Sequence, residues 1–193
     1  MIILGIDPGL NHTGYGVIEA AGSRVKFIMA GVINVPKGAL GDRLAHIHRE
    51  VDAIAKEVRP DLASCEKVFV NVNPASTLLL GQARGAAIAA LAINGLEVRE
   101  FNPTEVKMSV VGAGRATKDQ VQAMVKRILA IEADLKPDAA DALAIAITAA
   151  QSDWVVTGAH AAEKTNAGLA RRRHLSGKHV RQAWETALGV NRK

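Results

Sequence analysis

Two short apolar runs, each ending in an acidic residue, place the strongest constraint on the fold of this chain. The run from Ile2 to Ile6 leads directly into Asp7, and the run from Leu62 to Cys65 leads into Glu66. A continuous apolar run is typical of a strand buried on both faces, as in a sheet covered by helices. Acids at the ends of such strands, rather than on solvated faces, indicate a carboxylate site that holds hard cations.

The periodicity of the rest of the chain predicts an α/β fold. Three strand-like segments come first and are followed by segments that alternate between helix and strand, which favours a mixed five-stranded sheet with helices on both faces. Gly22 and Ser23 suit a hairpin turn between the second and third strands. The expected strands span residues 2–6, 15–19, 24–35, 62–68 and 97–101, and the expected helices span 40–58, 74–94, 104–111, 118–131 and 138–151.

Length and composition indicate one domain with a tail. The 193 residues fit one domain over 1–151 and a basic extension over 152–193, in which residues 152–170 lose periodicity and resemble a linker. The chain contains no apolar run of about 18 residues, so we expect no membrane span. The N-terminus lacks the features of a secretory signal, and a single cysteine permits no internal disulfide, so we expect a cytoplasmic protein.

The net charge of +5 belongs to the tail. Residues 151–193 contain eight Lys or Arg and three acids, whereas the preceding 150 residues contain sixteen of each sign. Like-charged runs are often interaction arms, so the arginine-rich tail would suit DNA binding. A merely solubilising tail explains the same composition equally well.

Asp138 and Asp141 add two further acids to the candidate site. They follow Pro137, lie three residues apart and would share one face of the last helix. With Asp7 and Glu66 they form a set of ligands suited to Mg²⁺, and two such ions about 4 Å apart can promote phosphodiester cleavage. Each acid also has an ordinary explanation, because Asp138 would suit a helix N-cap or first turn and Asp141 a solvated surface. Four acids placed in this way favour a site.

The segment from Asp7 to Gly14 has a second interpretation. An acid followed by a turn rich in Gly and Thr between two strands can hold phosphate through its backbone N–H groups. The sugar-kinase and actin fold binds nucleotide with such a hairpin. The chain is short for the two lobes of those proteins, which disfavours a kinase.

Three motifs in the same order resemble the RuvC family of Holliday-junction resolvases. They are Ile6-Asp7-Pro8-Gly9, Gly81-Gln82-Ala83-Arg84-Gly85 and the run from Asp138 to Ala144. The resemblance covers residues 1 to about 151 and implies a ribonuclease H-like fold. It further implies a homodimer that makes paired, Mg²⁺-dependent nicks in four-way DNA junctions with 5′-phosphate products, beside a branch-migration motor. It assigns metal binding and catalysis to Asp7, Glu66, Asp138 and Asp141, with one or two Mg²⁺ ions per subunit and Mn²⁺ as a substitute.

Four other residues are candidates for DNA contact. Phe69 follows the strand that ends in Glu66, where a ring would stack on or wedge between bases, although a core Phe would have the same sequence context. The resemblance places Lys107 and Lys118 near the DNA and the site, and a lysine beside the scissile phosphate would stabilise its charge. Arg84 suits either packing or phosphate contact. Leu79 departs from the family, where many relatives have a lysine.

Two other functions stay open on the sequence. A ribonuclease H-like enzyme of RNA processing would share the acidic core, but the motif from Gly81 to Gly85 and Phe69 favour the junction enzyme. A protein that binds junctions without cutting them would not need all four acids.

Overall fold

The computed structural model describes residues 1–68 and 73–160, with side chains up to residue 152. Five strands form one sheet in the order β3-β2-β1-β4-β5, in which β2 is antiparallel to both neighbours and β4 and β5 run parallel to β1. The strands are β1 (Ile2–Asp7), β2 (His12–Ala21), β3 (Arg24–Asn34), β4 (Leu62–Glu66) and β5 (Val98–Phe101). The helices are α1 (Leu40–Val58), α2 (Pro74–Ile93), α3 (Pro103–Val111), α4 (Lys118–Ile128) and α5 (Pro137–His160).

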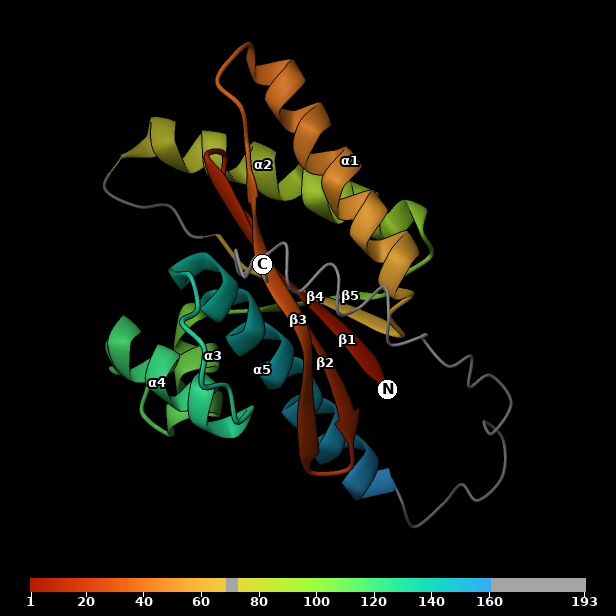
Figure 1. The fold of residues 1–193 in the computed structure, drawn as a ribbon, viewed down its shortest axis with the longest axis vertical. Coiled ribbons are helices and arrows are strands. Elements are labelled where there is room, and N and C mark those ends of the chain that lie inside the picture. The colour runs from red at the N-terminus through yellow and green to blue at the C-terminus, as the bar shows by residue number, and fades with distance from the viewer. Residues whose placement is uncertain (69–72, 161–193) are drawn as a thin grey trace, which may run out of the picture.

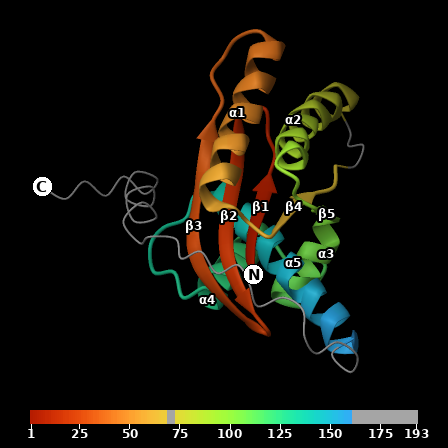
Figure 2. The ribbon, with the colours of Figure 1, turned by 90° about the vertical axis from the view of Figure 1, so that its right-hand side faces the viewer.

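Helices cover both faces of the sheet, as Figures 1 and 2 show. Helices α1 and α2 lie over one face, and α5, flanked by α3 and α4, lies over the other. Strand alternation divides the two cores, since Ile3 packs in the α5 layer and Leu4 packs in the α1–α2 layer. The predicted mixed five-stranded sheet with helices on both faces is therefore confirmed.

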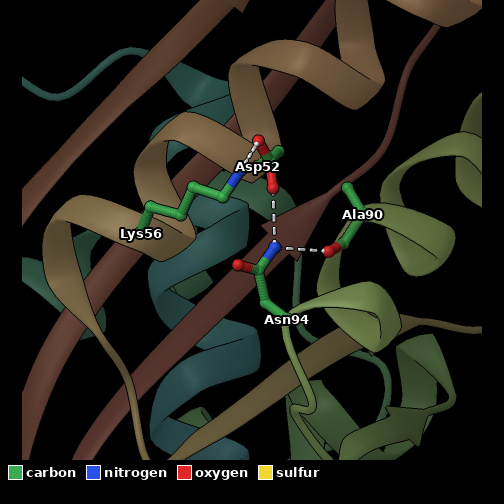
Figure 3. A network of polar contacts seen from close by, with 4 residues as sticks. All are labelled: Asp52, Lys56, Ala90 and Asn94. Carbon is green, nitrogen blue, oxygen red and sulfur yellow. Dashed lines mark hydrogen bonds and ion pairs between the residues drawn. The ribbon is translucent and has the colours of Figure 1, made fainter.

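Polar contacts close α1 against the end of α2 (Figure 3). The side-chain amide of Asn94 donates to Asp52 Oδ1 and to the carbonyl oxygen of Ala90, both at 2.8 Å. Lys56 Nζ approaches the other carboxylate oxygen of Asp52 to 2.7 Å. These donors, Lys56 first, lower the pKa of Asp52. They hold the C-terminal end of α2 beside α1.

Helix α5 lies unusually close to the sheet because glycines face it. A Cβ atom on Gly5 of β1 would overlap the carbonyl oxygen of Ala142, and one on Gly16 of β2 would overlap Leu143. Glycine in a strand interior often marks such a close backbone approach. Small residues on both sides therefore bring the first turns of α5 to the ends of β1 and β2.

The predicted elements are all present, with one substantial error at a boundary. We expected the last helix to end near Gln151 and a linker to follow, but α5 continues to His160. Residues 152–160 contain no proline, and adding residues to an existing helix costs little compared with nucleating one. The remainder of the predicted extension, 161–193, lies outside the described residues.

One helix among the described residues, α2, is long and apolar enough to cross a membrane by length and composition alone. This is weak evidence, because helices of water-soluble proteins pass the same test. Helix α2 packs against α1 and β5, and Arg84 lies near its middle. Most of the residues of α2 are nevertheless not buried.

Ser64 provides a first test of the packing beneath the site. Its side chain is fully buried in β4, and its hydroxyl has no hydrogen-bond partner within the described part of the chain. A buried unsatisfied hydroxyl costs about 1–3 kcal/mol. We therefore expect Ser64→Ala to raise the free energy of unfolding by about 1 kcal/mol in urea titrations. A loss of stability would show that the hydroxyl makes a hydrogen bond, for example to a buried water.

Candidate active site

Asp7 and Glu66 lie side by side at the carboxyl ends of the two central parallel strands. The register of β1 and β4 ends at the pair Ile6 and Cys65, so the two acids are the next residue on each strand. Alternation along β1 and β4 directs both toward the face covered by α5, because Ile3 and Leu62 pack in that layer. Cys65 points the other way and is a fully buried free thiol. The predicted meeting of Asp7 and Glu66 at one sheet edge is confirmed.

Gly14 gives the first turn of α5 its access to this edge. In the β1–β2 register Gly14 is the partner of Asp7, and a Cβ atom there would overlap the carbonyl oxygen of Asp138. Helix α5 begins at Pro137, so Asp138 lies in its first turn rather than at the N-cap. Asp141 is one turn further along the same face. Asp138 and Asp141 thus approach the two strand-end acids from the helix side.

The pKa values show that the four carboxylates share one electrostatic environment. Burial first, and then the charges of Asp141, Glu66 and Asp138 in that order, raise the pKa of Asp7 to about 8. Burial and then Asp141 also raise the pKa of Glu66. Like charges gathered in a partly buried site disfavour one another's ionised form. We call Asp7, Glu66, Asp138 and Asp141 the acidic cluster.

Two lysines face the acidic cluster. Lys118 Nζ lies 3.3 Å from Asp141 Oδ2, and this carboxylate is the main reason why the pKa of Lys118 is raised. A capping box between Thr117 and Gln120 begins α4 and fixes the backbone next to Lys118. Lys118 and Lys107 both oppose the rise in the pKa of Glu66. Both predicted basic residues therefore lie within electrostatic reach of the cluster.

The acidic cluster fits a hard divalent cation by its chemistry. All four side chains offer carboxylate oxygens, which Mg²⁺ and Mn²⁺ prefer. Their mutual repulsion, visible in the pKa of Asp7, is what a bound cation would remove. As the side chains stand, no three His, Cys, Asp or Glu residues of the described ranges converge closely enough to form a complete metal site. Ligand binding would have to draw the carboxylates together.

The raised pKa of Asp7 predicts how the stability of the metal-free protein depends on pH. Asp7 has a pKa of about 8 in the folded protein, compared with 3.8 for an unperturbed carboxyl. Between these values the folded state binds more protons than the unfolded state, so the free energy of unfolding falls as pH rises. The contribution is complete below about pH 4 and is lost by about pH 8, with a slope of at most about 1.4 kcal/mol per pH unit.

Urea titrations between pH 5 and 8.5 in a chelating buffer would measure this slope. We expect Asp7→Asn to flatten it, and saturating Mg²⁺ to reduce it in the unmodified protein. A metal-free protein whose stability is constant or increases over this range would contradict the assignment of Asp7 to a repulsive cluster.

Arg84, Leu79 and Phe69 are the remaining residues that the sequence singled out, and the structure describes the first two. Arg84 Nε donates to the carbonyl oxygen of Glu66 at 3.0 Å, and the same guanidinium pairs with Glu100. Leu79 lies on α2 with 40% of its surface exposed. Phe69 lies outside the described residues, so its expected role as a base-stacking ring stays a prediction.

Sequence reasoning missed two residues that shape the site. Gly14 was considered only as part of a turn, although an isolated glycine within a strand is a signal of close approach. Arg43 on α1 was not considered at all. Its Nη2 atom donates to the carbonyl oxygen of Leu10 at 2.8 Å and to Asn11 Oδ1 at 2.6 Å, which anchors the loop that follows Asp7. No periodicity in the sequence marks this long-range contact.

A mixed five-stranded sheet with acids at the ends of its two central strands and on a facing helix defines a ribonuclease H-like nuclease. The family model for crossover junction endodeoxyribonuclease RuvC matches residues 3–149. The chain belongs to the RuvC family, and it is a metal-dependent endodeoxyribonuclease.

Individual relatives agree with this assignment. Crossover junction endodeoxyribonuclease RuvC of Bordetella pertussis is 53% identical over 148 residues, which cover 76% of this chain and 81% of the relative. The Thermus thermophilus RuvC structure in complex with Holliday junction substrate has a TM-score of 0.76 at 32% identity and covers 81% of this chain and 97% of that one. A yeast mitochondrial Holliday junction resolvase, 17% identical with a TM-score of 0.60, shares the fold over 82% of this chain and 80% of its own.

Proposed function

We propose that this protein resolves four-way DNA junctions by paired, symmetric nicks that leave 5′-phosphates, during recombination and DNA repair. The observation that carries the proposal is the acidic cluster at the ends of β1 and β4, in a chain of the RuvC family. The Thermus relative whose structure holds a Holliday junction supports the choice of substrate.

Each residue of the site has a proposed role. Asp7, Glu66, Asp138 and Asp141 would hold Mg²⁺, one or two ions, with Mn²⁺ as a substitute. Mg²⁺ bound there would supply Lewis-acid stabilisation of charge on the scissile phosphodiester. Lys118, held beside Asp141 by its ion pair, would restrain that carboxylate and offset charge on the phosphate. Lys107 would contact DNA, and Phe69 would stack on bases of the opened junction.

A single assay tests the activity. The purified protein is incubated with a synthetic four-way junction, a plain duplex and a structured RNA, with Mg²⁺, with Mn²⁺ and with a chelator. We expect symmetric nicks on the junction alone and only with metal. Cleavage of RNA in preference would favour the RNA-processing enzyme, and junction binding with no cleavage in any metal would favour a binding protein.

The exposed apolar surface of α2 supports a homodimer. Leu78 and Ile93 on this helix are 71% and 74% exposed, and Leu79 is 40% exposed. Exposed apolar patches commonly mark interaction sites, and a twofold dimer would supply the two active sites that paired nicks require. We propose that α2 forms the dimer interface, so Leu79 would contact the partner subunit rather than DNA.

We expect Leu78→Asp to convert the dimer to a monomer in sedimentation velocity, because a buried charge in an apolar interface is costly. Met108→Asp, on the opposite layer at α3 and 54% exposed, is the matched control and should leave the dimer intact. A dimer that survives Leu78→Asp unchanged would place the interface elsewhere.

The family resemblance also bears on where the protein acts and with which partner. We propose a cytoplasmic protein that acts beside a branch-migration motor, as the family resemblance implies. The buried free thiol of Cys65 suits a reducing compartment.

A further inference from the structure

Arg84 connects three elements at the end of β4. It projects from the middle of α2, and its side chain is 21% exposed. Its Nε atom donates to the carbonyl oxygen of Glu66 at 3.0 Å, while an Nη atom pairs with the carboxylate of Glu100 on β5. The planar fork of a guanidinium suits two fixed acceptors in different directions. Arg84 therefore joins α2, the last residue of β4 and the neighbouring strand.

The hydrogen bond from Arg84 matters because Glu66 is the last residue of β4, where the pairing with β1 has ended. The ladder between β1 and β4 ends at the pair Ile6 and Cys65, one residue before Glu66. On the other side, Lys67 donates its N–H to the carbonyl oxygen of Phe101 at 2.9 Å. A charge-assisted hydrogen bond to the carbonyl oxygen of Glu66 thus fixes the backbone where the β1–β4 ladder has stopped. The direction of the Glu66 carboxylate depends on that backbone.

Arg84 acts on the main chain of Glu66 rather than on its carboxylate. It lies on the α2 side of the sheet, whereas the Glu66 side chain faces the α5 layer by strand alternation. Lys118 and Lys107 are the cations that act on the carboxylate itself. Glu100 in turn neutralises and orients the guanidinium. Because Arg84 binds the backbone of Glu66 and not its carboxylate, the carboxylate is available to the acidic cluster.

We propose that Arg84, oriented by Glu100, is a positioning residue that fixes the end of β4 and thereby aims Glu66 into the acidic cluster, and that it does not bind DNA phosphate. The inference rests on the proposed function of that cluster. Partners that orient a metal ligand typically change metal affinity or activity about 10- to 100-fold when they are lost.

Three variants separate positioning from phosphate contact: Arg84→Gln, Arg84→Lys and Glu100→Gln. The readouts are Mn²⁺ affinity of the DNA-free protein by calorimetry, junction affinity in chelator over a range of salt concentrations, and cleavage rate at saturating junction. Arg24→Gln, in the β2–β3 hairpin at the far end of the sheet from Asp7, is the matched control. Thermal melts confirm that each variant is folded, and Glu100→Gln tests the pair without removing Arg84.

We expect Arg84→Gln to weaken Mn²⁺ affinity and slow cleavage of bound junction at least about 10-fold, with unchanged junction affinity and salt slope. Arg84→Lys should resemble Arg84→Gln, since a lysine cannot span both acceptors, and Glu100→Gln should show a smaller loss of the same kind. A weaker junction affinity with a salt slope reduced by about one, and normal Mn²⁺ affinity, would make Arg84 a phosphate contact and overturn the proposal.

Metal affinity and cleavage that are both unchanged in Arg84→Gln would equally overturn it. If the unmodified protein cuts no junction, the proposed function fails instead, and the calorimetric comparison still decides whether Arg84 positions a metal ligand.

Discussion

Asp7→Asn is expected to abolish junction cleavage while leaving the fold and junction binding intact. The substitution keeps the shape of the side chain but removes one of the four carboxylates of the acidic cluster, at the position where burial and the other three acids act most strongly. A loss of about 4 kcal/mol of transition-state stabilisation corresponds to about a 10³-fold slower rate. The measurement is single-turnover cleavage of a synthetic junction, with binding followed separately in chelator.

The same substitution should have the opposite effect on stability. Removing a charge that the folded state disfavours should make metal-free Asp7→Asn more stable than the unmodified protein at pH 8. The matched control is Asp134→Asn. Asp134 is fully exposed and pairs with Lys126 at 3.5 Å, so this substitution should change neither the cleavage rate nor the stability. Cleavage by Asp7→Asn at the normal rate would show that the site is assigned wrongly.

Gly14→Ala is expected to damage both stability and activity, although it adds a single methyl group. That methyl would overlap the carbonyl oxygen of Asp138, so the first turn of α5 would have to move away from β2. Overpacking of this kind typically costs about 1–3 kcal/mol of stability. Because Asp138 lies in the turn that moves and Asp141 lies in the next turn of the same helix, we also expect cleavage to fall at least about 10-fold at saturating junction and metal.

Gly41→Ala is the control for this prediction. Gly41 lies in α1 with open space around the position of a Cβ atom, and alanine favours helix over glycine by about 1 kcal/mol. This variant should therefore be as stable as the unmodified protein or more so, and fully active. A Gly14→Ala protein of unchanged stability would show that α5 does not lie as close to β2 as the structure places it.

Local sequence patterns predicted most of the fold because the patterns report burial directly. The continuous apolar runs identified β1 and β4, and the helical spacing from Leu44 to Val58 identified α1 with the observed bounds. The end of α5 was predicted wrongly, since a loss of amphipathic pattern after Gln151 does not stop a helix when no proline follows.

The sequence likewise predicted one part of the candidate site and missed another. Acids at the ends of apolar strands were recognisable without coordinates, because the carboxyl ends of neighbouring parallel strands meet at one edge of a sheet. Gly14, Arg43 and the pairing of Arg84 with Glu100 were not recognisable, because each depends on a contact between segments far apart in the chain. Such contacts leave no local periodicity.

The sequence alone determined which residues carry charge at the ends of which strands, and its resemblance to the RuvC family assigned Asp7, Glu66, Asp138 and Asp141 to one site. Only the tertiary structure decided how they meet. Burial beside one another raises the pKa of Asp7, a strand glycine admits Asp138, and Arg84 is directed to the backbone of Glu66 rather than to solvent. The physical reason is that electrostatic coupling and close packing depend on distance in space, which separation along the chain does not fix.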